Sequence, residues 1–112
     1  SEVAEAVVAA ATARTRLAIV SHITSASALI FPATEITRRL RERGIDVLVD
    51  GAHAPGQIDL NIEAMKPTYY VGSLHKWVSA PKGTAFLYVE KERRAGVRPL
   101  CLSSRAHRLR PE

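Results

Sequence analysis

The sequence predicts an α/β fold, a three-layer structure in which helices flank a mostly parallel sheet. Short apolar segments with β-branched residues alternate with segments of helical patterning. That alternation is typical of parallel strands joined by crossover helices. The chain has 112 residues, of which 46% are hydrophobic and 24% are charged. This length and composition suit a single compact globular domain.

The elements follow one another in a regular order along the chain. Residues 1–13 are rich in alanine and valine with two early glutamates, which favours an amphipathic helix. A second helix is expected to begin near Pro32 and to end at Gly44, and a short third helix covers residues 61–65. Apolar runs predict strands at 17–20, 46–50, 68–72 and 84–89.

The second helix has two distinct faces. Ile36 and Leu40 lie four residues apart and are expected to face the core. Opposite charges four residues apart predict ion pairs on the outer face, Glu35 with Arg39 and Arg38 with Glu42.

Polar side chains gather where three predicted strands end, at residues 21–25, 50–53 and 73–76. Ligands of open α/β sheets bind outside the carboxyl ends of the strands. Taken singly, an Asp after a strand forms turns, a loop Lys is a surface residue and a His is structural. Together they are less common, because a polar group at a buried edge costs about 1–3 kcal/mol unless it finds a partner. The pattern predicts a functional site at this edge.

Three motifs resemble the class V aminotransferase family of fold-type I enzymes that depend on pyridoxal 5′-phosphate (PLP). They are Asp-Gly-Ala-His-Ala-Pro-Gly at 50–56, Gly-Ser-Leu-His-Lys-Trp at 72–77 and Ala-Pro-Lys-Gly at 80–83. The closest resemblance is to the isopenicillin N epimerase-like branch, which includes cysteine desulfurase and carbon–sulfur lyase relatives. The resemblance implies that residues 1–103 are part of the large PLP-binding domain and that 104–112 form a divergent basic tail.

The resemblance implies a role for each residue of the central motifs. Lys76 would form a Schiff base with PLP and move protons at the substrate α-carbon. Asp50 would face the pyridine nitrogen and keep it protonated, since a nearby carboxylate shifts such a pKa by about 1–3 units. His53 would bond the phenolic oxygen, and Ala52 would leave room for the ring.

Further positions are implied around this centre. Ser73 and His75 match phosphate contacts, and Thr24 and Ser25 match the segment beside the cofactor oxygen or the substrate. Lys82 is a rival for the Schiff base but lacks an adjoining Ser and His, so we interpret it as a loop residue. Trp77 follows Lys76, and we interpret it as a packing residue. Cys101 does not match a catalytic cysteine.

The resemblance also has departures. The family has an upstream phosphate loop and stacking ring, and a downstream small domain with a carboxylate-binding arginine, and this sequence contains none of these. In the family sheet another strand lies between the third and fourth strands identified here, so a gap is expected between them. The residues after Leu100 do not follow the family pattern.

Two functional hypotheses remain open. The first is a fragment of a PLP enzyme acting on an amino acid by epimerisation, transamination or C–S cleavage, with a homodimer partner or the missing remainder of the enzyme completing the site. The second is a catalytically inactive fragment that serves as a structural or interaction module through its open sheet edges. A metal site is a further alternative, built from Asp50 and three histidines, His22, His53 and His75.

Charge and hydropathy bear on two other classes of protein, those that bind nucleic acid and those that span a membrane. The net charge is +5, and arginines cluster at 38, 39, 41 and 43 and again at 105, 108 and 110. Nucleic-acid binding through these clusters is an alternative, but a solvated helix face and tail are the expected structure. The sequence has no apolar run near the ~20 residues that span a bilayer, and its single cysteine forms no internal disulfide. A cytoplasmic location is therefore expected.

Overall fold

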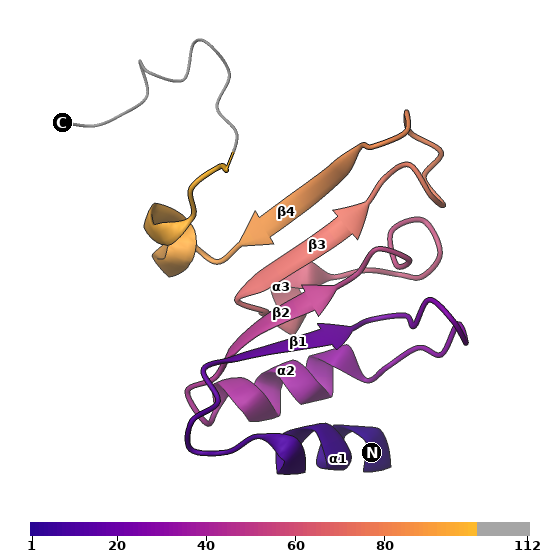
Figure 1. Ribbon diagram of the computed structural model, residues 1–112. Coiled ribbons are helices and arrows are strands. Elements are labelled where there is room, and N and C mark those ends of the chain that lie inside the picture. Colours follow the sequence, from indigo (N-terminus) through magenta and orange to yellow (C-terminus); the bar gives the residue numbers. More distant parts are fainter. Residues whose placement is uncertain (101–112) are drawn as a thin grey trace, which may run out of the picture.

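A computed structural model describes residues 1–100 as a four-stranded sheet with helices packed beside it (Figure 1). Its elements are α1 (Glu2–Ala10), β1 (Leu17–Ser21), α2 (Ala33–Arg41), β2 (Asp46–Asp50), α3 (Ile62–Met65), β3 (Tyr69–Ser73), β4 (Ala85–Val89) and the 3₁₀ helix η1 (Lys91–Gly96). Each predicted strand is confirmed with ends that differ by at most one residue, while η1 was not predicted. Cys101 and the predicted tail at 104–112 lie outside the described residues.

The sheet is mostly parallel, as predicted, with the strand order β1-β2-β3-β4. β1, β2 and β3 run parallel, and their register places Ser21 beside Asp50 and Asp50 beside Val71. The expected gap beyond β3 is wrong, because β4 pairs with β3 directly and antiparallel from Tyr69↔Val89 to Ser73↔Ala85. This pairing satisfies backbone N–H and C=O groups that an open β3 edge would leave without partners.

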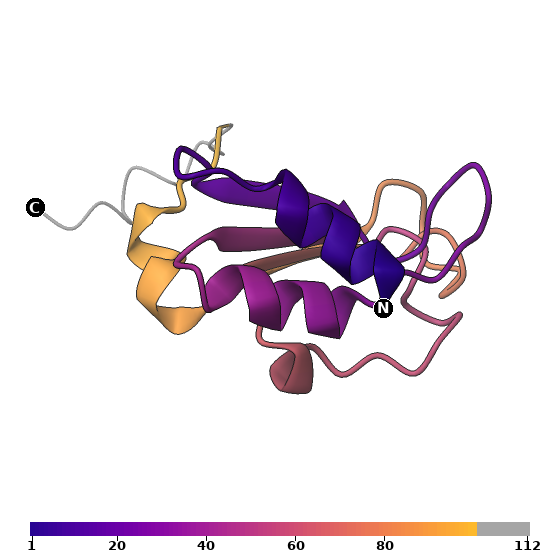
Figure 2. The same ribbon diagram turned by 90° about the horizontal axis from the view of Figure 1, so that it is seen from below.

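The core lies between the sheet and the helices on one side of it. In Figure 2 the sheet is seen nearly edge-on, with α2 and α3 on the same side. The buried apolar cluster joins α1, α2 and the inward face of the strands, and includes Ala4, Val20, Ile36, Leu40, Val47, Val49 and Tyr70. The other face carries partly exposed apolar side chains, including Ile19 (68% exposed) and Leu87 (50% exposed). Residues 1–100 therefore form two of the three expected layers.

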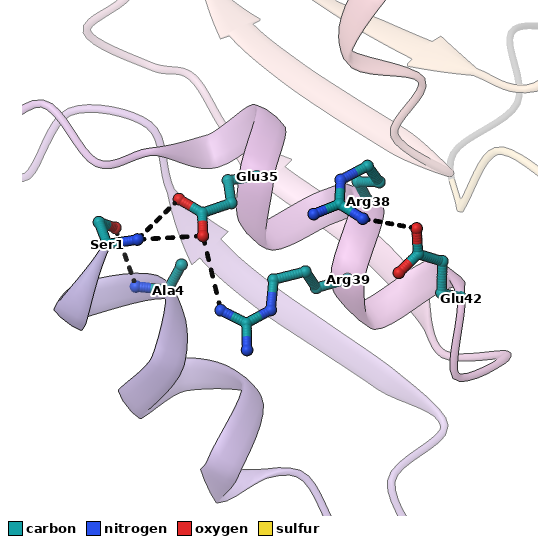
Figure 3. Close-up of polar contacts among 6 residues, drawn as sticks. All are labelled: Ser1, Ala4, Glu35, Arg38, Arg39 and Glu42. Atoms are coloured by element: carbon teal, nitrogen blue, oxygen red, sulfur yellow. Dashed lines mark hydrogen bonds and ion pairs between the residues drawn. The ribbon is translucent and has the colours of Figure 1, made fainter.

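The helix α2 has the two faces that its sequence predicts. Ile36 and Leu40 are fully buried. On the outer face Arg39 lies 3.5 Å from Glu35, and Arg38 lies 2.6 Å from Glu42, so both predicted ion pairs form (Figure 3). After the helix ends at Arg41, the turn passes through Gly44, whose φ of +72° is the left-handed conformation that glycine favours.

The helix α1 is capped and attached at its first residue. The Ser1 hydroxyl accepts a hydrogen bond from the Ala4 N–H, as expected of an N-cap serine. The Ser1 amino group donates to both carboxylate oxygens of Glu35 at 3.1 Å (Figure 3). These hydrogen bonds, more than any other contact, lower the pKa of the Glu35 carboxyl below its ordinary value. The carboxylate thus links α1 to α2.

A buried threonine completes the pairing where β2 begins. Thr68 precedes β3 and is fully buried, and its hydroxyl accepts a hydrogen bond from the Val47 N–H at 3.0 Å. The backbone register of β2 with β3 begins only at Leu48↔Tyr69. The side chain of Thr68 therefore supplies an acceptor to a strand N–H that lies before the paired residues.

Candidate active site

Three loops meet at one edge of the sheet, and they contain the residues predicted for the site. Residues 22–32 follow β1, residues 51–61 follow β2, and residues 74–84 follow β3 (Figure 1). Since the three strands are parallel, their carboxyl ends lie at the same edge. The antiparallel β4 begins at this edge, with Ala85 opposite Ser73. We call this edge with its three loops the rim.

Asp50 is the last residue of β2 and stands at the centre of the rim. Its neighbour Val49 is buried on the helix side, so the alternation of the strand directs the Asp50 side chain to the open face of the sheet. The carboxylate Oδ1 accepts a hydrogen bond from the Ala52 N–H at 3.0 Å. Within residues 1–100 this is the one hydrogen bond to the carboxylate, which leaves Oδ2 available to a ligand.

Lys76 lies on the loop after β3, close to the loop after β2. Its exposed amine is 3.3 Å from Nε2 of His53, so two of the residues singled out in the sequence are neighbours at the rim. A shallow hollow of about 400 Å³ lies beside them, lined by His53, Lys76 and Trp77. A primary amine, an imidazole and an indole thus border one open space.

The interpretation of Trp77 as a packing residue is wrong. Its side chain is 54% exposed, whereas its backbone lies against Gly56. A Cβ added to Gly56, which has a φ of +80°, would stand 3.1 Å from the Trp77 carbonyl group. The backbone of Trp77 therefore packs against Gly56, while its side chain lines the hollow.

Ser73 and His75 follow one another at the end of β3. Ser73 is partly exposed, and within residues 1–100 its hydroxyl has no hydrogen-bond partner. The Nδ1 atom of His75 lies 3.0 Å from the carbonyl oxygen of Thr84, to which it donates. That bond fixes the ring and leaves Nε2 for another partner.

The loop after β1 uses one of its predicted hydroxyls for its own structure. The Thr24 hydroxyl lies 2.7 Å from the Ser27 hydroxyl and accepts a hydrogen bond from the Leu29 N–H. Ser25 is exposed at the same loop. Lys82 is exposed in a turn before Gly83, whose φ is +88°, which agrees with its interpretation as a loop residue.

The site also contains a buried pair that sequence reasoning missed. His22 and Tyr70 are both buried, and Nδ1 of His22 lies 2.9 Å from the Tyr70 hydroxyl. Burial lowers the pKa of His22. Burial, with a smaller contribution from the charge of Asp50, raises the pKa of Tyr70 to about 12. The available signal was a tyrosine within a predicted strand, since a buried tyrosine hydroxyl needs a partner.

The metal alternative is not assembled in the part of the chain that the structure describes. No three side chains of histidine, cysteine, aspartate or glutamate gather there to hold an ion. The histidines instead contact three different groups, His22 the Tyr70 hydroxyl, His53 the Lys76 amine and His75 a backbone carbonyl.

The arginines of the first cluster are engaged within the chain. Their partners are Glu42 for Arg38, Glu35 for Arg39, Glu90 for Arg41, and the carbonyls of Val8 and Ala11 for Arg43. The structure therefore gives nucleic-acid binding no set of unpaired guanidinium groups on this helix. The second predicted cluster lies outside the described residues.

A second and larger hollow lies away from the rim. It measures about 780 Å³ and is bordered by α2, α3 and η1, with Arg41, Met65 and Tyr88 among its lining residues. These residues lie near the amino ends of β2 and β3, opposite the edge that carries Asp50 and Lys76.

None of the helices in residues 1–100 has the length and apolar character needed to cross a bilayer.

Comparison with known proteins identifies the family. Residues 3–109 match the class V aminotransferase family. The chain belongs to this family. The resemblance recognised in the motifs at 50–56 and 72–77 is thus confirmed over nearly the whole sequence.

The curated relatives of this class V chain include epimerases and desulfhydrases. Isopenicillin N epimerase of Amycolatopsis lactamdurans is 45% identical over 98 residues, and that of Streptomyces clavuligerus is 44% identical over 103 residues. These matches cover 88% and 92% of the chain but 25% and 26% of the relatives. A probable chloroplastic L-cysteine desulfhydrase of Arabidopsis thaliana is 39% identical over 88 residues, covering 78% of the chain and 18% of the relative. The chain therefore spans about a quarter or less of these proteins.

Solved structures confirm the α/β fold. A cystine C-S lyase in complex with its reaction product cysteine persulfide superposes with a TM-score of 0.79 and 29% identity, covering 86% of this chain and 26% of that one. SspA in complex with cysteine superposes with a TM-score of 0.77 and 26% identity, covering 88% of this chain and 28% of that one.

The rim of this class V chain has groups that fit PLP, the cofactor that the sequence resemblance implies. Asp50 presents a carboxylate oxygen with no protein partner in residues 1–100, and the Lys76 amine is exposed beside a hollow. The carboxylate oxygen can accept a hydrogen bond from a cationic ring nitrogen. The amine can act as the nucleophile toward an aldehyde. The donor set thus suits the cofactor.

Proposed function

We propose that this chain forms part of the PLP-binding domain of an enzyme that acts on an amino acid, with Lys76 as the residue that bonds the cofactor. The supporting observation is the position of the Lys76 amine, 3.3 Å from His53 and at the same sheet edge as Asp50. When bound, PLP supplies an electron sink for bonds at the substrate α-carbon. The residues of the chain hold it and move protons.

Lys76 has the chemistry of the nucleophile. Its neutral amine would be the nucleophile that bonds the aldehyde group of the cofactor. The attack needs the nitrogen lone pair, and His53 Nε2 at 3.3 Å is within reach to accept a proton from Nζ. The same amine would carry a proton to or from the substrate α-carbon.

Asp50 would hold the proton on the pyridine nitrogen. Its Oδ1 is fixed by the Ala52 N–H, which leaves Oδ2 as the acceptor. A carboxylate favours the protonated ring through both its charge and its hydrogen bond. His53 would hydrogen-bond the phenolic oxygen of the ring as well as contact Lys76. Ala52 would contribute a small side chain where the flat ring lies.

Ser73 and His75 would bind the phosphate. The Ser73 hydroxyl is uncommitted within residues 1–100 and can donate to an anion. His75 Nδ1 already donates to Thr84, so its Nε2 is the ring atom that would face the phosphate. At the neighbouring loop, Ser25 is the exposed hydroxyl that would meet the substrate, while Thr24 shapes that loop.

The substrate class is proposed from the relatives. Their names include an epimerase, an L-cysteine desulfhydrase and a cystine lyase. We therefore propose an amino-acid substrate and one of three reactions, namely epimerisation, transamination or C–S cleavage. A homodimer partner or the remainder of a longer enzyme would supply the rest of the site.

The test is chemical labelling of the purified chain with PLP. After borohydride reduction, peptide mass mapping is expected to find the added pyridoxyl group on Lys76 at low PLP concentration. Lys76→Ala should abolish this label, and Lys82→Ala, the matched loop control, should retain it. A folded sample with no preference for Lys76 over the other lysines would overturn the assignment.

A catalytically inactive interaction module is the second candidate, favoured by the open sheet face. Leu17, Ile19 and Leu87 are 46%, 68% and 50% exposed on it. Sheets with parallel strands are usually covered on both faces. A second copy of the chain would cover this face, so light scattering after size exclusion should find a dimer that Ile19→Lys disrupts. A strict monomer at high concentration would exclude this candidate.

A further inference from the structure

His22 and Tyr70 form a buried polar pair directly behind the Asp50 turn. Tyr70 is fully buried on the inward face of β3, and His22 is 7% exposed just after β1. Their hydrogen bond is 2.9 Å long, and the rings meet edge to face at 85° with centroids 6.0 Å apart. Two residues that are 48 positions apart in the sequence are therefore joined by one polar contact.

The pair is in contact with the backbone around Asp50. The His22 N–H donates to the Asp50 carbonyl at 2.8 Å. The Tyr70 hydroxyl lies so close to Gly51 that a Cβ on that residue would overlap the phenol ring. Gly51 in turn donates to the Val71 carbonyl at 2.8 Å. The turn that carries the carboxylate is thus held by residues on both flanking strands.

The Tyr70 ring is itself fixed from the side of β4. Phe86 stacks on it with an angle of 7° between the planes and 6.1 Å between the centroids. Gly72 makes this stacking possible, because a side chain there would collide with Phe86. The phenol therefore has little freedom to swing away from His22 and Gly51.

Both members of the pair are neutral near pH 7. Burial lowers the pKa of His22, and burial with the negative charge of Asp50 raises the pKa of Tyr70 to about 12. The two neutral side chains can then form their hydrogen bond without placing a charge beside Asp50. The carboxylate is left without a competing cation from this side.

We infer that His22 and Tyr70 are positioning residues, whose buried hydrogen bond fixes the turn at Asp50 so that its carboxylate faces the ligand side of the rim. Neither residue would touch the ligand. For the identity of that ligand, a protonated heteroaromatic ring, the inference rests on the proposed function. For the orientation of Asp50 it rests on the contacts of the chain alone.

The decisive measurement needs no cofactor. In the Tyr70→Phe variant the ring and its packing are kept and the hydroxyl is removed. NMR of the folded chain should show that the Ala52 amide proton and the carboxyl carbon of Asp50 change their chemical shifts, because the Asp50–Ala52 hydrogen bond loosens. Tyr69→Phe, on the open face of the same strand, should leave both signals in place. A role limited to stability would lower the melting temperature without moving these folded-state signals.

A pair of His22 variants gives the same test if Tyr70→Phe does not fold. Gln can still bond the Tyr70 hydroxyl, so His22→Gln should retain more of the Asp50 and Ala52 signals than His22→Leu. Unchanged signals in folded Tyr70→Phe, or equal signals in the two His22 variants, would overturn the inference. In the same samples PLP affinity should fall about three- to tenfold in Tyr70→Phe, as for loss of one hydrogen bond. If the unaltered chain binds no PLP, the proposed function fails and the NMR result still decides this inference.

Discussion

The Lys76 amine and Nε2 of His53 lie 3.3 Å apart and join the loop after β3 to the loop after β2. When the lysine donates in this contact, Nε2 of the imidazole is the acceptor and Nδ1 carries the ring proton. Because Lys76 is exposed, the contact adds at most about 1 kcal/mol to the free energy of unfolding. Its importance is therefore chemical rather than structural.

Replacing His53 should separate these two effects. We expect His53→Ala to change the free energy of unfolding by less than about 1 kcal/mol. The same variant should slow the reaction of Lys76 with an amine-directed reagent near neutral pH severalfold, since the acceptor for its proton is gone. Denaturant unfolding and mass spectrometry of labelled peptides measure the two quantities. Lys82 in the same sample is the internal control, and equal slowing at both lysines would contradict the expectation.

Gly51 is a position at the rim where one added methyl group should be strongly destabilising. A Cβ at residue 51 would overlap the Tyr70 hydroxyl, which is buried and cannot retreat. We expect Gly51→Ala to lower the free energy of unfolding by roughly 1–3 kcal/mol or more, as for overpacked interiors. Gly96→Ala is the matched control, because no atom lies within 4 Å of its added Cβ. Equal midpoints for the two variants in urea unfolding would refute the close contact.

The lowered pKa of His22 predicts a loss of stability in acid. In the folded chain burial holds the pKa of His22 below its ordinary value of 6.5. As the pH falls through 6.5, the unfolded chain takes up this proton before the folded chain does, so the free energy of unfolding decreases. Above about pH 7 this decrease in the free energy of unfolding is absent. Curves of unfolding free energy against pH for the unaltered chain and His22→Gln should therefore diverge, and parallel curves below pH 6.5 would disprove this origin.

The strands and the rim could be predicted because their signals are local. An apolar run such as residues 46–50 identifies a strand by its own composition, and the structure has the same bounds. Once three such strands are taken as parallel, their polar ends must share an edge. The sequence alone therefore predicts that Asp50, His53 and Lys76 lie at the same edge.

The remaining features depend on contacts between distant parts of the chain. The antiparallel pairing of β3 with β4 replaces the expected gap, and no local pattern distinguishes the two arrangements. The partner of Tyr70 is 48 residues away in the sequence. The contact between the Trp77 backbone and Gly56 joins residues 21 positions apart, and neither residue type reveals it alone.

The hydrogen bond from Val47 to Thr68 predicts a specific cost for an isosteric substitution. Thr68→Val keeps the volume but removes the acceptor, so the buried Val47 N–H at the start of β2 loses its partner. An unsatisfied buried donor costs about 1–3 kcal/mol, and we expect that decrease in the free energy of unfolding. Thr34→Val, at an exposed position of α2, should change it by less than about 0.5 kcal/mol. Hydrogen exchange supplies the second measurement, since the Val47 amide should lose protection in Thr68→Val. A Val47 amide that stays protected there would show that another acceptor serves it.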